Sequence, residues 1–97
     1  MSHITIILGT HLECAKLTAE NANNTTLADL LATLKTKAMQ LDDKHKTLDK
    51  GHPDAEAMHE VLENIQAIAI DMCDNQNISG REGDVEEMIG QCDFYLP

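Results

Sequence analysis

Five histidines and three cysteines are the side chains in this sequence best suited to bind a metal ion. His11 and Cys14 are three residues apart, so one helical turn would bring them to the same face. Structural zinc sites have four such ligands, and two more cysteines would have to approach in space to complete the set. A zinc-binding regulatory module is therefore an alternative function, with His11, Cys14, Cys73 and Cys92 as candidate ligands. The main prediction is that the chain uses no metal and no cofactor.

A second cluster of titratable residues lies in the stretch GHPDAEAMHE, residues 51–60. His52 and His59 are seven residues apart, which separates their backbones by about 10 Å along one helix. Because zinc holds its ligands at roughly 2 Å, the two histidines should not share an ion. Pro53 suits the first position of a helix, and the acidic residues that follow it suit the helix dipole. The stretch therefore predicts the start of a helix.

Carboxylates at one-turn spacing raise the alternative of an enzyme. Glu60 with Glu63 forms one pair, and Asp84 with Glu87 forms another. Two such pairs on facing helices can hold Mg²⁺ against the phosphates of a nucleotide. In this spacing the chain resembles the all-α nucleoside triphosphate pyrophosphatases of the MazG type, and the resemblance implies a Mg²⁺-dependent enzyme as an alternative. Because Glu60 and Glu63 lie opposite the apolar stripe of their helix, the main prediction is that the chain is not an enzyme.

Apolar spacing predicts the elements that would position these residues. In residues 26–50 an apolar seam recurs every three or four residues, at Leu27, Leu31, Leu34, Ala38, Leu41, His45 and Leu48. A second stripe follows in residues 53–76, at Met58, Val61, Leu62, Ile65, Ile68, Ala69 and Met72. Thr26 with Asp29 predicts a capping box for the first helix, and Gly51 ends it. The short connection predicts a long antiparallel helical hairpin, with His45 as a core or interface histidine.

The two ends of the chain predict one further helix each. Apolar residues keep helical spacing through Gly9, which favours an N-terminal helix, while the β-branched run leaves a short strand at residues 3–8 as the alternative. Asp84 with Glu87 predicts the capped start of a short C-terminal helix. The predicted fold is an all-α small helical bundle, a single domain over residues 1–97. An α+β fold is the alternative.

The charge of the chain excludes several classes of partner. The net charge is −10, and residues 51–97 hold eleven acidic residues against Arg81 alone. Such a surface repels a phosphate backbone and an anionic membrane, so we expect neither nucleic acid nor a membrane as partner. No apolar run approaches the length of a membrane span. The lysines of the first long helix are expected to pair across the hairpin with Glu56, Glu60 and Glu63; they are Lys35, Lys37, Lys44, Lys46 and Lys50.

Cysteine usage indicates the compartment. Cys14, Cys73 and Cys92 are odd in number, so they cannot all pair within one chain. The first residues lack the basic start and the length of a secretory signal. Reduced thiols and a cytoplasmic location are therefore expected, in the host cytoplasm if a phage encodes the chain.

These observations together predict that the chain acts by binding another protein. A strongly acidic surface can dock on a basic one, with association steered by charge. One version is an inhibitor that covers the nucleic-acid-binding surface of an enzyme, as phage counter-defence proteins do. The candidate partner-binding residues are Glu56, Glu60, Glu63, Asp71, Asp74, Glu86, Glu87, Phe94 and Tyr95. The long apolar stripes also predict a homodimer through helix packing.

Overall fold

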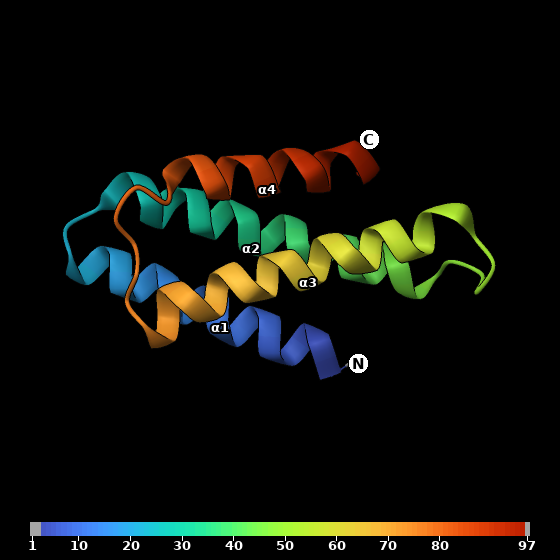
Figure 1. Ribbon diagram of the computed structural model, residues 1–97, viewed down its shortest axis with the longest axis horizontal. Coiled ribbons are helices and arrows are strands. Elements are labelled where there is room, and N and C mark those ends of the chain that lie inside the picture. Colours follow the sequence, from blue (N-terminus) through green and yellow to red (C-terminus); the bar gives the residue numbers. More distant parts are fainter. Residues whose placement is uncertain (1–2, 97) are drawn as a thin grey trace.

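Four α-helices make up the chain in this computed structural model, which describes the backbone of residues 3–96 and the side chains from residue 8 onward. The helices are α1 (His3–Asn21), α2 (Thr25–Lys46), α3 (Pro53–Asp74) and α4 (Glu82–Tyr95), as Figure 1 shows. No strand occurs among the described residues, so the prediction of an all-α bundle is confirmed. The alternative strand at residues 3–8 is wrong, because these residues form the first turns of α1.

The predicted hairpin is formed by α2 and α3, which run in opposite directions on either side of a short loop (Figure 1). The first helix ends at Lys46 and not at residue 50. The Thr47 hydroxyl donates a hydrogen bond to the carbonyl of Lys44 at 2.7 Å, and the backbone N–H of Thr47 donates to the same carbonyl. These bonds tighten and close the last turn. The second helix begins as predicted at Pro53, where His52 Nδ1 accepts a hydrogen bond from the Asp54 N–H at 3.0 Å.

The capping boxes predicted at the other helix starts are wrong. The cap of α2 is Asn24, whose side-chain oxygen accepts a hydrogen bond from the Leu27 N–H at 3.1 Å, so Thr26 already lies inside the helix. Helix α4 begins at Glu82, two residues before Asp84, and its start has no capping side chain. Asparagine caps a helix as well as threonine does, so the local sequence leaves several possible starts.

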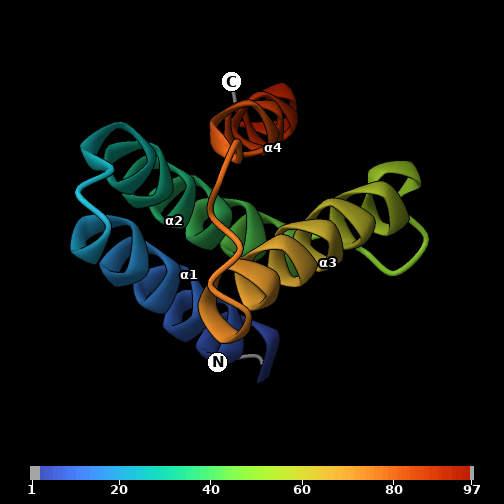
Figure 2. The same ribbon diagram turned by 60° about the vertical axis from the view of Figure 1, so that its left-hand side comes forward.

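The core is built around the apolar seam of α2. Its residues Leu27, Leu31, Leu34, Ala38 and Leu41 are fully buried. Figure 2 shows α2 between α1 on one side and α4 on the other, and α3 also contacts it. The stripe of α3 is buried mainly against α1, and the buried residues of α4 face α2. No helix within residues 3–96 has the length and apolar character needed to span a membrane.

The predicted pairing of the α2 lysines with α3 is wrong. Lys35 Nζ lies 3.1 Å from Glu13 Oε2 on α1, while Lys37 pairs with Asp93 on α4. Lys46 Nζ lies 3.1 Å from Oδ2 of the buried Asp42 in its own helix. Lys35 and Lys37 pair in this way because α1 and α4, and not α3, lie beside them on the two sides of α2.

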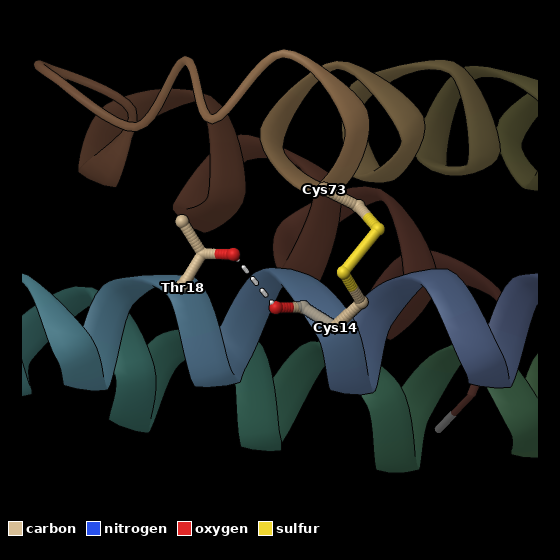
Figure 3. Close-up of a disulfide and its surroundings, with 3 residues drawn as sticks. All are labelled: Cys14, Thr18 and Cys73. Atoms are coloured by element: carbon tan, nitrogen blue, oxygen red, sulfur yellow. Dashed lines mark hydrogen bonds between the residues drawn. A yellow bond between two sulfur atoms is a disulfide. The ribbon is translucent and has the colours of Figure 1, made fainter.

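A disulfide joins α1 to α3 (Figure 3). Cys14 and Cys73 are 59 residues apart in sequence, and their Cα atoms lie 5.4 Å apart, which suits a disulfide. Thr18 donates a hydrogen bond to the Cys14 carbonyl at 3.0 Å, one turn further along α1. The expectation that all three thiols are reduced is therefore wrong for this structure. Cys92 remains a free thiol and is buried.

Removing the disulfide should destabilise the fold. Closing a loop of this length restricts the unfolded chain, so its loss should lower the free energy of unfolding by roughly 2–4 kcal/mol. Urea unfolding of the wild type, with and without a dithiol reductant, measures this difference. The Cys14→Ser/Cys73→Ser variant is the control, because reductant should not change its unfolding midpoint. A wild-type midpoint unaffected by reductant would show that the disulfide does not hold α1 to α3.

Candidate functional site

A groove lies between α3 and α4. It has a volume of about 410 Å³ and is lined by Val61, Glu87, Gly90, Gln91, Phe94 and Tyr95. It exists because α4 turns its buried residues Val85, Met88 and Cys92 toward α2, while α3 packs mainly on α1. Figure 1 shows α4 lying along α2, and Figure 2 shows it standing away from much of α3. The two walls of the groove are therefore helices that run in opposite directions and are joined by residues 75–81.

Both aromatic residues of the chain line this groove. Phe94 is 79% exposed, whereas Tyr95 is half-buried against the core. Their ring centroids lie 4.9 Å apart in an edge-to-face arrangement. Lys44 donates a hydrogen bond to the Tyr95 carbonyl, which fixes the last turn of α4 on α2. Tyr95 thus packs against the core, while Phe94 points into solvent.

The groove has an acidic border. Glu87 lines it, and the neighbouring Glu86 is exposed on α4. On the opposite wall Glu60 is exposed and directly precedes Val61. An apolar floor beside exposed carboxylates favours a ligand that carries both apolar and cationic groups.

The predicted partner-binding residues divide into three groups. Glu87, Phe94 and Tyr95 line the groove. The remaining exposed carboxylates, all outside the lining, are Glu56, Glu60, Glu63, Asp74 and Glu86. Asp71 differs from these carboxylates, because it is half-buried and its carboxylate is used in bonds within the chain. The sequence alone did not identify Val61, Gly90 or Gln91 as lining residues of a groove.

Asp71 is the centre of a polar cluster that sets the start of α4. Its carboxylate accepts hydrogen bonds from Asn75 at 2.8 Å and Asn77 at 2.9 Å, and it pairs with Arg81. Arg81 also lies 2.9 Å from Asp84 in the first turn of α4. These bonds hold the loop after α3 in place and thereby determine where α4 begins. The hydrogen bonds from Asn75 and Asn77 lower the pKa of Asp71, and Arg81 adds to this effect.

A second bond attaches the start of α4 to the turn between α1 and α2, which lies at the same end of the bundle (Figure 1). The Asn24 amide, in the turn between α1 and α2, donates to Glu82 Oε1 at 2.9 Å. This hydrogen bond lowers the pKa of Glu82. The first turn of α4 is thus bonded both to the end of α3 and to the start of α2.

Histidines meet at a different place, between α2 and α3. The rings of His45 and His59 are stacked with centroids 5.8 Å apart, and His59 Nε2 lies 2.7 Å from Glu63 Oε1. His45 is half-buried, as expected for a histidine on the α2 seam. Neither histidine lines the groove.

The ligand sets of the two alternative functions are not assembled among the described residues. Within this part of the chain, no three His, Cys, Asp or Glu side chains gather closely enough to hold a metal ion. Cys14 and Cys73 are bonded to each other, and burial raises the pKa of the Cys92 thiol to about 11. Of the two carboxylate pairs, Glu63 pairs with His59 and Asp84 with Arg81.

The cluster around Asp71 should make the fold sensitive to acid. The pKa of Asp71 lies below its ordinary value of 3.8, and that of Glu82 below 4.5. A carboxylate whose pKa is lower in the folded than in the unfolded state contributes stability above the unfolded pKa and loses it as the pH falls through the folded pKa. Urea unfolding should therefore show a free energy of unfolding that decreases from about pH 5 downward.

Asp71→Asn should make this decrease less steep. Asp74→Asn, one turn further on and exposed, is the matched control and should leave the slope as in the wild type. An unchanged slope in Asp71→Asn would show that the cluster does not contribute to the acid sensitivity.

Comparison of the chain with protein-family models, with curated proteins and with solved structures found no match.

Proposed function

We propose that this protein acts by binding another protein through the α3–α4 groove and the carboxylates that border it. The observation that carries the proposal is the exposure of Phe94, 79% of whose surface meets solvent at the edge of an apolar groove. Among the described side chains, Phe94 and Leu17 are the large hydrophobic ones that are exposed. Phe94 lines the α3–α4 groove, whereas Leu17 does not.

An exposed aromatic ring beside a groove suits the centre of a protein interface. Covering a phenylalanine side chain stabilises a complex by about 1.5–3 kcal/mol, and aromatic residues are enriched among those that dominate binding energy. Tyr95 supports the ring from the core side.

The expected partner carries positive charge. Residues 51–97 hold eleven acidic residues; Glu87 lines the groove, and Glu60 and Glu86 are exposed on the helices that form its walls. Complementary charge accelerates association and disfavours partners of like charge. The more specific form of the proposal is an inhibitor that covers the basic nucleic-acid-binding surface of an enzyme, as phage counter-defence proteins do.

A homodimer stays a prediction. The length of the apolar stripes of α2 and α3 predicts it, but α1 and α4 bury these stripes within the chain. Two copies joined at the groove would bring the Glu86 and Glu87 of both chains together. Like charges oppose such contact, so a basic partner is the better occupant of the groove.

Replacing Phe94 tests the proposal. Immobilised wild type, Phe94→Ala and Leu17→Ala would be compared for proteins captured from the cells in which the chain occurs. We expect a basic protein to bind the wild type and Leu17→Ala, and at least about tenfold less to bind Phe94→Ala. The complex should weaken between about 50 mM and about 500 mM salt. Leu17→Ala is the matched control because Leu17 is also exposed, on α1.

Three outcomes would contradict the proposal. Equal capture by Phe94→Ala would show that the groove is not the binding site. An acidic or salt-insensitive partner would contradict the role of charge. Recovery of the chain itself, with a dimer mass in solution that is lost in Phe94→Ala, would show that a second copy occupies the groove.

A further inference from the structure

Gly90 is a feature of α4 for which the fold gives no reason. It lies in the interior of the helix, where glycine is the least favourable residue apart from proline. Its backbone is not in the left-handed region, and a Cβ built on it meets no atom within 4 Å. Neither its conformation nor packing inside the chain therefore requires a glycine.

Gly90 does line the groove, beside Gln91 and opposite Val61. The missing side chain leaves the backbone of α4 open at this point, so the main chain of a partner can approach it closely. Any larger residue would occupy the space that the partner needs. The position of the glycine thus indicates where on α4 an incoming segment would cross.

The shape of the groove favours a helix as this segment. Its walls are two antiparallel helices, and a third helix packed between two others is the usual arrangement in a bundle. The described residues contain no strand edge to which an extended peptide could hydrogen-bond. A helix satisfies its own backbone hydrogen bonds and needs only an apolar face and a charged face to fit here.

We infer that the α3–α4 groove receives one cationic amphipathic helix of the partner, whose backbone crosses α4 closely at Gly90. Its apolar face contacts Val61 and Phe94, and its lysines or arginines face Glu86 and Glu87. The inference rests on the proposed function and adds two points to it. The segment of the partner that binds is a helix, and Gly90 is the residue of α4 that lets this helix approach closely. The lining part of α4 runs from Glu87 to Tyr95, so it offers about 13 Å of contact, or roughly two and a half turns.

The test uses two leucine substitutions in the same helix. Gly90→Leu fills the groove, whereas Gly83→Leu lies in the first turn of α4 and outside the groove lining. A side chain at either glycine meets no atom of the chain at its Cβ, so both variants should fold, and circular dichroism would verify this. Gly90→Ala is a milder variant that keeps the test decisive if Gly90→Leu does not fold.

The probe is a synthetic peptide of about 18 residues with leucine and lysine at amphipathic helical spacing. A peptide of the same composition, reordered so that it has no apolar face, is its control. Fluorescence anisotropy would measure the dissociation constant of each peptide at low salt. We expect the amphipathic peptide to bind the wild type and Gly83→Leu equally and to bind Gly90→Leu at least about tenfold more weakly. Binding to Gly90→Ala should be weakened in the same direction.

Failure of the inference can be told apart from failure of the proposed function. If both peptides bind, and Gly90→Leu binds them as tightly as Gly83→Leu does, the acidic surface attracts cationic chains but the inferred helix site is wrong. If neither peptide binds the wild type, the inference and the proposed function are both contradicted.

Discussion

The apolar seam of α2 is the surface on which the arrangement of the other helices depends. Its leucines are fully buried because α1 covers one side and α4 the other, while α3 returns from the hairpin and packs mainly on α1. Helix α4 packs mainly on α2 and makes few contacts with α3. Because α4 meets α3 only in part, the groove forms between these two helices, beside the buried Val61. The candidate binding site is thus a result of how the core is shared among four helices.

Polar bonds then determine where α4 lies along α2. Asp71 and Arg81 fix the loop that precedes it, Asn24 bonds to its first turn, and Lys37 and Lys44 bond to its last turns. Most of these groups are partly exposed, so each contributes little to the free energy of unfolding. Their effect is on position, because they act at both ends of a helix whose buried face is short. Together they keep Phe94 at the edge of the groove.

The sequence predicts the helices well because their apolar spacing is local information. The seam of α2 and the stripe of α3 predict two helices directly. Pro53 correctly predicts the residue at which α3 begins. The sequence does not show which residues far apart in the chain come into contact. The spacing of Cys14 and Cys73 in the sequence does not predict a disulfide between them, because their approach depends on how α1 packs on α3. The lysines of α2 were assigned to α3 for the same reason, because the sequence does not show that α1 and α4 occupy its flanks. Glu87, Phe94 and Tyr95 were identified from charge and aromatic character, whereas Val61 and Gly90 become part of a site only through the packing of α4.

The most direct test of binding at the α3–α4 groove is an NMR titration of the isotopically labelled protein with the cationic amphipathic peptide. If the groove is the binding site, changes in backbone amide chemical shift should concentrate on α4 at Gly90, Gln91 and Phe94 and on α3 near Val61. The amides of α1 should be unaffected. Shifts confined to the hairpin corner near His45 and His59, or spread evenly over all exposed carboxylates, would contradict the claim that the α3–α4 groove is the binding site.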